Sequence, residues 1–367
     1  MNNTHARIAL LAVLFLALSS TVRAQRTQSD SRAPQQFADL GDFKLQNGAV
    51  IQTLRLGYRT LGTLNQERSN AVLWPSWLGG RSADLLRYVG PGNVLDDSKY
   101  FVILVDAIGD GISTSPSNSA AQPRMKFPQF TIRDMVESEH KLLTTVLHIS
   151  HLRAVMGISM GGMQTFEWVV AYPDFMDLGI PMAGSPQSTS YDKLLWTSQI
   201  DALEADPGWD GGDGTARMTR GYAIYNEIGS MNLTSPEYRV QHTSPADFGS
   251  FLASTTRGAG TAAAASDAIR QRQAIMSLDD PTEYRTTLAG LAARIRAKLL
   301  VFISPEDHTV NPDPAKALAA AANAPVVALD SPCGHISFDC ISVGPVVSRF
   351  LADPASVKSQ VLQGGER

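Results

Sequence analysis

The sequence is poor in cysteine, and its lysines and arginines form no block. Only two cysteines occur among 367 residues, Cys333 and Cys340, and no spacing of cysteine and histidine resembles that of a zinc site. The formal net charge is −4, so a nucleic-acid partner has no electrostatic support. We therefore predict no metal, no cofactor and no nucleic-acid partner.

Long apolar runs are scarce too, and the one at the N-terminus is typical of a processing segment. Residues 8–18, IALLAVLFLAL, follow Arg7 and are too short to span a bilayer comfortably. Small residues precede a cleavage position after Ala24. This predicts a signal peptide, residues 1–24, then a flexible polar leader, residues 25–37, and export to the periplasm or the cell exterior. The alternative is an uncleaved membrane anchor, whereas the cleaved protein would have no stable insertion in a membrane.

The two cysteines lie close together in SPCGHISFDC. In an oxidising compartment such a pair can form a disulfide. Closing so short a loop would stabilise the protein by roughly 2–3 kcal/mol. The alternative is a pair of buried free thiols, and the separation of the two Cα atoms, which the sequence does not show, decides between them.

Short apolar runs that end in turn residues alternate with segments of helical spacing along most of the chain. This alternation is typical of a mostly parallel sheet with helices on both faces. Residues 187–292 instead combine strong helix formers with glycine-rich loops, which predicts a mostly helical insertion. Residues 38–186 and 293–367 then form one α/β core. The runs predicted as strands include VIQTLRLGYRTLGTL (expected as an early hairpin), NAVLWPS, YFVILVDAIGDG, LRAVMGIS, LGIPMAGSP, AKLLVFIS and PVVALD.

A Gly-x-Ser-x-Gly motif centred on Ser159 lies in VMGISMGGMQ. The motif alone is weak evidence, because small residues also occur where a helix packs closely on a sheet. Here a predicted strand enters the motif and a predicted helix leaves it, and Gly157 and Gly161 relieve crowding in the tight turn. This context predicts Ser159 as a nucleophile. The backbone amide of Met160, at the helix N-terminus, is then placed to stabilise an oxyanion.

A serine nucleophile needs a base and an acid. In strand–turn–helix serine enzymes the chain order is nucleophile, acid, histidine. His335 lies just past the last predicted strand of the sheet, in SPCGHISF, and is the predicted base. Asp307, just after the preceding strand in PEDHTVNP, is the acid predicted to orient that imidazole. Its neighbour Glu306 is expected to be solvated.

The second oxyanion donor is expected from the loop after an early strand. The segment VLWPSWLGG, residues 72–80, is that loop. The backbone amide of Trp77 is the preferred donor, and that of Leu78 is the alternative. Packing of the large Trp77 side chain is compatible with this role, because only its amide would act.

Taken together, these segments resemble the homoserine O-acetyltransferase branch of the α/β-hydrolase superfamily. The resemblance covers roughly residues 38–185 and 298–352. It implies an α/β-hydrolase fold, a mostly parallel central sheet flanked by helices, with residues 187–292 as a helical lid over the active site. It also implies a homodimer that forms through this lid. The resembling segments are FKLQNGAVIQTLRLGYRTLGTLNQERSNAVL, VGPGNVLDDSKYFVILVDAIGDGISTSPSN, GISMGGMQ, PEDHTVNP and CGHISF.

The sequence also departs from that family at the acceptor site. The resemblance implies an aspartate after the catalytic histidine, to hold the amino group of the acceptor, but Ile336 stands there. The family's acceptor-binding arginine and tyrosine have no clear equivalents. Arginines and tyrosines lie nearby without the expected spacing, namely Arg217, Arg220, Tyr222 and Tyr225.

These observations favour an exported serine hydrolase that cleaves small-molecule carboxylic esters through an acyl-enzyme on Ser159. An exported enzyme would also lack cytoplasmic acetyl-CoA as a donor. The first alternative is acyl transfer to an alcohol by the same three residues, as in the acetyltransferases. The second is an inactive hydrolase fold that serves as a binding module.

Overall fold

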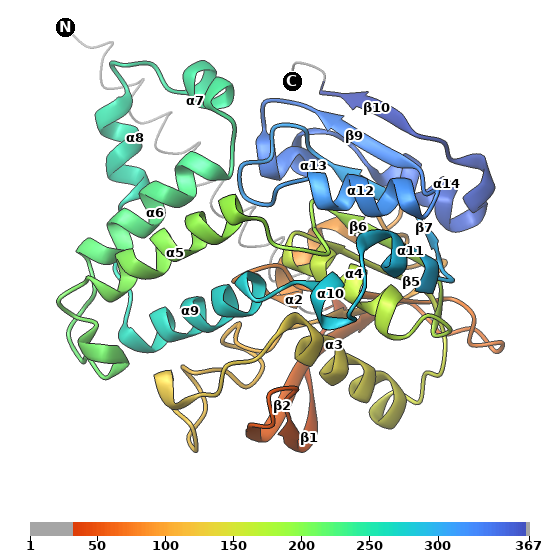
Figure 1. The fold of residues 1–367 in the computed structure, drawn as a ribbon, viewed down its shortest axis with the longest axis horizontal. Coiled ribbons are helices and arrows are strands. Elements are labelled where there is room, and N and C mark those ends of the chain that lie inside the picture. Colours follow the sequence, from red (N-terminus) through yellow and green to blue (C-terminus); the bar gives the residue numbers. More distant parts are fainter. Residues whose placement is uncertain (1–31, 365–367) are drawn as a thin grey trace, which may run out of the picture.

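The structure is a computed structural model that describes residues 32–364. The predicted signal peptide, residues 1–24, lies outside the described residues. One ten-stranded sheet forms the centre of the core (Figure 1). Its strands lie in the order β1-β2-β4-β3-β5-β6-β8-β9-β10, with β7 beside β6. The pairs β1–β2 and β2–β4 are antiparallel, and all later pairs are parallel. The strands are β1 (Gln36–Lys44), β2 (Val50–Leu61), β3 (Ala71–Pro75), β4 (Phe101–Val105), β5 (Leu152–Ile158), β6 (Met176–Met182), β7 (Lys298–Leu299), β8 (Val301–Ile303), β9 (Val326–Asp330) and β10 (Gln360–Gln363).

Helices cover both faces of the sheet, and the side chains of successive strand residues point to opposite faces. In β3, Leu73 belongs to the cluster under α3, α4, α11 and α12, whereas Val72 and Trp74 belong to the cluster under α2 and α14. This confirms the predicted α/β-hydrolase architecture of a mostly parallel sheet flanked by helices. The core helices are α2 (Ser82–Leu85), α3 (Ile132–Lys141), α4 (Met160–Ala171), α12 (Asp313–Ala321), α13 (Ser337–Cys340) and α14 (Gly344–Ala352).

The chain between β6 and β7 is helical, as its composition predicts. The insertion has a small apolar core of its own, which includes Leu203, Trp209 and Ile269. Whether it acts as a lid stays a prediction. Its helices are α5 (Ser190–Glu204), α6 (Arg220–Asn232), α7 (Pro236–His242), α8 (Phe248–Thr255), α9 (Ala262–Met276), α10 (Asp280–Glu283) and α11 (Leu288–Arg294).

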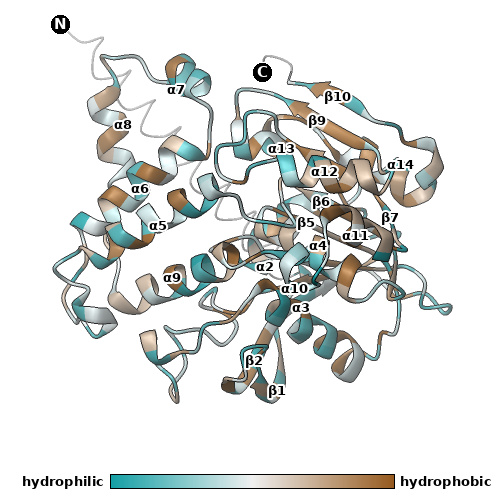
Figure 2. Cartoon of the chain, in the orientation of Figure 1, coloured by the Kyte–Doolittle hydropathy of each residue, from teal (hydrophilic) through white to brown (hydrophobic). Residues whose placement is uncertain are grey.

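The outer helices of the insertion carry exposed apolar side chains. Met231, Val240 and Phe248 are 69%, 77% and 53% exposed, and Figure 2 shows hydrophobic residues along α6 and α8. Such a surface would suit the predicted homodimer, which stays a prediction. Within residues 32–364, no helix combines the length and the apolar composition that crossing a bilayer requires.

The core begins earlier than the sequence indicates. Ala33 is fully buried, and its carbonyl oxygen accepts a hydrogen bond from the guanidinium of Arg59 on β2. Strand β1 begins at Gln36. Ala33 therefore packs against the sheet and residues 36–37 belong to it, although the sequence placed residues 25–37 in a flexible leader. The contact with Arg59 is remote in the chain, so the polar local composition did not reveal it.

The expected early hairpin is also placed differently. Residues 50–61 form one continuous strand, β2, and its hairpin partner is the preceding strand β1. The pairing between them shifts register around Gly41, which has a positive φ of 68°. The turn of the hairpin lies at residues 45–49, before the segment that the alternation pointed to.

A buried carboxyl group joins α3 to α4, the helix that follows Ser159. Glu139 on α3 is 1% exposed, and its Oε2 accepts a hydrogen bond from the Trp168 Nε1 of α4 at 2.6 Å. Its other oxygen has no partner among the described residues. Burial raises the pKa of Glu139 from 4.5 to about 8, so the folded protein holds this carboxyl group protonated near neutrality.

We expect this group to make the protein less stable as the pH rises from about 5 to about 8. In that window the folded protein keeps the Glu139 proton, whereas the unfolded chain, with a pKa of 4.5, releases it. The free energy of unfolding is therefore highest below pH 4.5 and falls as the pH rises to the folded pKa of about 8. Glu139→Gln, a neutral mimic that still accepts from Trp168, should remove this part of the dependence. The melting temperature measured across pH 5–9 tests it, with the exposed Glu67→Gln as the matched control. Parallel wild-type and Glu139→Gln profiles would contradict the expectation.

Candidate active site

Ser159 occupies the turn between β5 and α4, with backbone angles φ 57° and ψ −122°. A positive φ is uncommon for a residue other than glycine, and this conformation is strained. Two main-chain hydrogen bonds hold it. The Ser159 N–H donates to the Met182 carbonyl oxygen at 2.9 Å, and the Ser159 carbonyl oxygen accepts from the Met163 N–H at 2.9 Å.

Both glycines of the motif are required by close packing. A Cβ at Gly157 would overlap the carbonyl oxygen of Gly161, and a Cβ at Gly161 would lie 2.6 Å from the carbonyl oxygen of Pro75. Only glycine lets β5, the end of β3 and the first turn of α4 come this close. The motif is thus a tight joint between helix and sheet, and that joint presents the Ser159 side chain to a cavity.

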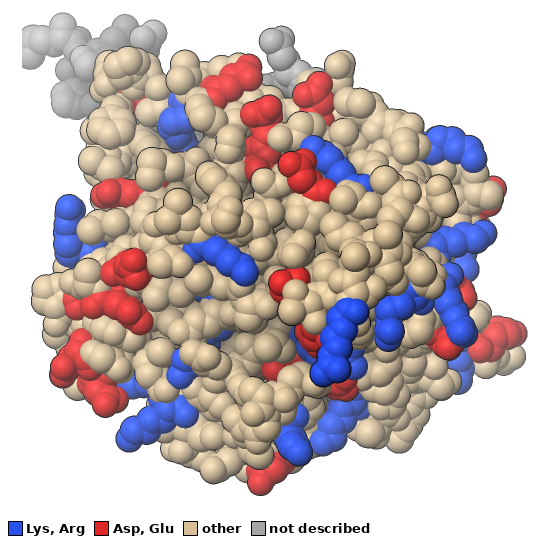
Figure 3. Space-filling view, viewed as in Figure 1, with Lys and Arg blue, Asp and Glu red and all other residues tan. Residues whose placement is uncertain are grey.

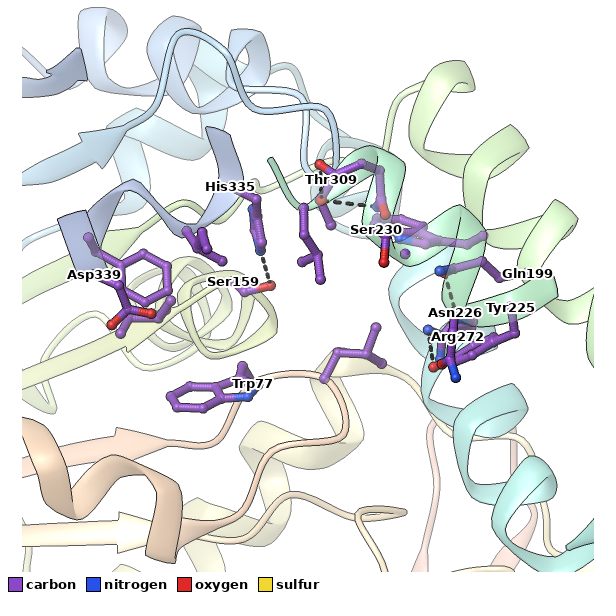
Figure 4. Close-up of a pocket in the computed structure, with 18 of the residues that line it drawn as sticks. Trp77, Ser159, Gln199, Tyr225, Asn226, Ser230, Arg272, Thr309, His335 and Asp339 are labelled. Carbon is purple, nitrogen blue, oxygen red and sulfur yellow. Dashed lines mark hydrogen bonds between the residues drawn. The ribbon is translucent and has the colours of Figure 1, made fainter. Parts of the chain in front are cut away.

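The three residues predicted as nucleophile, base and acid form one hydrogen-bonded chain. The Ser159 Oγ lies 2.8 Å from His335 Nε2 (Figure 4). His335 Nδ1 lies 2.7 Å from Asp307 Oδ2. The side chains of His335 and Asp307 are 5% and 1% exposed. The second carboxylate oxygen of Asp307 accepts from the backbone amides of Thr309 and Val310 at 2.8 and 2.9 Å. These amides fix the carboxylate while its other oxygen orients the imidazole.

The topology of the sheet explains why these residues meet. Ser159 follows β5, Asp307 follows β8 and His335 follows β9. The three strands run parallel, so their carboxyl ends lie at the same edge. The neighbouring Glu306 has a side chain 57% exposed, in accord with its expected solvation.

The loop that carries His335 is closed by a disulfide. Cys333 and Cys340 are bonded, with their Cα atoms 6.6 Å apart, which decides the question that the sequence left open. Within this loop, Asp339 accepts a hydrogen bond from the Tyr88 hydroxyl at 2.5 Å and pairs with Arg87 at 3.4 Å. His335 therefore lies in a covalent ring, which the ion pair between Asp339 and Arg87 also holds in place.

The predicted oxyanion donors border the same space. Met160 is the first residue of α4, so its N–H has no acceptor within the helix. Trp77 and Leu78 both line the cavity with Ser159, and neither amide has a hydrogen-bond acceptor among residues 32–364. The next amide along the chain, that of Gly79, is already occupied, because it donates to Gln271 Oε1 at 2.8 Å. The indole of Trp77 also packs edge-on against Tyr88. The side chain of Trp77 therefore packs against the core, while its backbone amide stays without an acceptor in the described part of the chain.

A cavity of about 550 Å³ opens above Ser159 between the core and the insertion. Its core side mixes apolar residues, which include Leu78, Ile336 and Phe338, with polar and charged ones, which include Arg87, Thr309 and Asp339. Its insertion side is largely polar. The residues on that side include Trp196, Gln199, Tyr225, Asn226, Ser230, Asn232, Leu233, Thr255 and Arg272.

The sequence missed much of the polar wall. Of the four residues considered for an acceptor site, Tyr225 lines the cavity, and Tyr222 packs against its ring with centroids 6.0 Å apart. Arg217 and Arg220 are exposed instead. The buried arginine of the cavity is Arg272 on α9, inside a segment that the sequence identified only as a strong helix former.

No protein-family model matches the chain. Among curated proteins, it is 39% identical over 188 residues to a probable esterase of Corynebacterium glutamicum, covering 50% of this chain and 54% of that one. It is 34% identical over 215 residues to an ethyl acetate hydrolase of Pseudomonas veronii, covering 57% and 61%. It is 36% identical over 211 residues to a homoserine O-acetyltransferase of Moorella thermoacetica, covering 52% and 56%. The matches thus span between half and two thirds of these relatives.

Solved structures match over most of the chain. An acetylester hydrolase of Corynebacterium glutamicum superposes with a TM-score of 0.79 at 27% identity, covering 87% of this chain and 96% of that one. The acetyl esterase MekB gives a TM-score of 0.79 at 26% identity, covering 89% and 99%. A homoserine O-acetyltransferase of Bacillus anthracis shares the fold, with a TM-score of 0.78 at 22% identity, covering 89% and 99%.

Proposed function

We propose that the chain hydrolyses carboxylic esters through an acyl-enzyme on Ser159, as a member of the homoserine O-acetyltransferase-like branch of the α/β-hydrolase superfamily. The observation that carries the proposal is the buried chain of hydrogen bonds from Asp307 through His335 to Ser159, at the base of a cavity. A cavity of this size accommodates a small-molecule ester.

The geometry supports a two-step mechanism. The Ser159 Oγ attacks the ester carbonyl carbon while His335 Nε2 accepts the hydroxyl proton, and Asp307 stabilises the imidazolium through Nδ1–H. The amides of Met160 and Trp77 would receive the oxyanion. The C–O bond then breaks, the alcohol leaves with the proton from His335, and the acyl group stays on Ser159. Water attacks the acyl-enzyme with His335 as base, which releases the acid and restores Ser159.

Two features support water as the acyl acceptor. Ile336, directly after the base, lines the cavity with an apolar side chain at the position where the acetyltransferases are expected to hold an amino group. The export that residues 1–24 indicate would also separate the protein from acetyl-CoA. The relatives named esterase and ethyl acetate hydrolase agree with this choice.

Substrate assays on the purified protein test the proposal. We expect hydrolysis of 4-nitrophenyl esters between acetate and decanoate, and no homoserine-dependent release of coenzyme A from acetyl-CoA. Fast acetyl transfer to homoserine would instead favour the acyltransferase. Failure to turn over any ester, together with failure of a fluorophosphonate to label Ser159, would favour a binding module.

A further inference from the structure

The cavity contains a positive charge that no acidic residue balances. Three charged side chains line it, Arg87, Asp339 and Arg272. Asp339 is paired with Arg87 at 3.4 Å. Within residues 32–364, no carboxylate lies within 4.0 Å of the Arg272 guanidinium, although the outer surface carries charges of both signs (Figure 3). The cavity therefore presents one uncompensated cation.

Neutral groups hold Arg272 in place. It lies on α9 and is only 4% exposed. Its Nε donates to Gln199 Oε1 at 3.0 Å, its Nη1 to the Ala268 carbonyl oxygen at 3.1 Å and its Nη2 to the Tyr225 hydroxyl at 2.5 Å. Figure 4 shows Arg272 with Gln199 and Tyr225 on the insertion side of the cavity, across from Ser159. The guanidinium is thus fixed before any ligand arrives.

This arrangement leaves donors for a ligand. A guanidinium has five N–H groups, and three are used here, so one remains on each terminal nitrogen. The Tyr225 hydroxyl accepts from Arg272 and keeps its own proton to donate. A buried cation without a counter-ion costs free energy, which a carboxylate with two oxygens would offset by bidentate hydrogen bonding.

We propose that the cavity selects esters that carry a separate, ionised carboxylate, and that Arg272 binds this carboxylate with help from Tyr225. The inference rests on the proposed function, and it adds the class of substrate. The carboxylate can belong to either part of the ester. A half-ester of a dicarboxylic acid carries it on the acyl side, and the acetate of a hydroxy acid carries it on the alcohol side. A purely structural Arg272 would only tie α9 to α5 and α6.

Pairs of matched esters test the selectivity. On the acyl side, mono-4-nitrophenyl glutarate is compared with 4-nitrophenyl pentanoate, and on the alcohol side 4-acetoxybutanoate is compared with butyl acetate. In at least one pair, we expect the wild type to have the higher kcat/KM for the carboxylate ester. Arg272→Gln should lower the ratio of the two kcat/KM values by about 10- to 100-fold, as for loss of hydrogen bonds to a charged group. Arg272→Lys should restore part of the ratio.

Arg270→Gln is the matched control. Arg270 also lies on α9, is 8% exposed, and donates to the carbonyl oxygens of Phe127 and Met125 at 2.9 and 2.6 Å. It does not line the cavity. Its loss should lower stability and leave the selectivity ratio as it is. Equal kcat/KM values within both wild-type pairs, or an equal loss on both esters of a pair in Arg272→Gln, would overturn the inference.

A binding measurement separates this inference from the proposed function. Calorimetric titration of Ser159→Ala with monomethyl glutarate and with 4-acetoxybutanoate requires no turnover. We expect binding of at least one probe that weakens by about 10- to 100-fold when Arg272→Gln is added. Such binding without any ester hydrolysis by the wild type would refute the hydrolase and retain the carboxylate site. Equal affinities with and without Arg272 would refute the carboxylate site even if the hydrolase is real.

Discussion

Ser159→Ala is expected to lower kcat/KM for 4-nitrophenyl ester hydrolysis by about 10⁴-fold or more, because no acyl-enzyme can form. The Ser159 Oγ has one hydrogen-bond partner among the described residues, His335 Nε2, so its removal leaves no other polar group of the fold unpaired. The main-chain hydrogen bonds to Met182 and Met163 that hold the turn are kept. The variant should therefore fold and bind substrate but fail to turn it over.

Release of 4-nitrophenol and labelling by a fluorophosphonate measure this loss together. Ser266→Ala is a suitable control, because Ser266 is fully buried and its hydroxyl only donates back to the Ala262 carbonyl oxygen within α9. The control should keep both activity and labelling. Hydrolysis by Ser159→Ala within tenfold of the wild type would show that another residue is the nucleophile.

Asp307→Asn is expected to lower kcat by about 10³- to 10⁴-fold. Asp307 Oδ1 accepts from two backbone amides, so the oxygen of an asparagine must face them and its NH₂ group must face His335. His335 Nδ1 would then have to accept a hydrogen bond, and the ring proton would move to Nε2. Nε2 would donate toward Ser159 instead of accepting its proton, and base catalysis would be lost.

The pair Asp307→Asn and Glu306→Gln makes this test specific. Both variants replace one carboxylate by its amide at adjacent positions, but the Glu306 side chain is 57% exposed. Glu306→Gln should keep kcat close to that of the wild type. A loss of less than tenfold in Asp307→Asn would mean that the carboxylate does not set the tautomer of His335.

The sequence was most informative where chemistry depends on chain order and strand ends. Ser159, Asp307 and His335 each follow an apolar run, and parallel strands bring such positions to one edge of the sheet. The fold class could be predicted for the same reason, since the alternation of strands and helices leaves few other arrangements. The disulfide could only be proposed, because it depends on a separation of Cα atoms that the spacing does not determine.

Contacts between elements far apart in the chain were not predictable. Arg272 reaches the cavity only because α9 packs beside α5 and α6, and nothing in its local sequence distinguishes it from Arg270, which points elsewhere. The burial of Ala33 likewise depends on Arg59, 26 residues away. Local pattern therefore predicted side chains that meet at the sheet edge, but not the insertion residues that complete the cavity.

The lining of the cavity is divided between the core and the insertion. Ser159 and His335 follow strands of the sheet, whereas the polar wall of the cavity belongs to insertion helices. These helices share a small cluster that includes Leu203 and Ile269, and they reach the main core through Trp196 and Ile275. Substitutions at sites without shared contacts have nearly additive effects. Substitutions at cavity-facing positions whose side chains bond only within the insertion, such as Gln199 and Tyr225, are thus expected to change substrate choice while the turn at Ser159 stays intact. For engineering, the predicted catalytic residues and these positions of the cavity wall can then be varied separately.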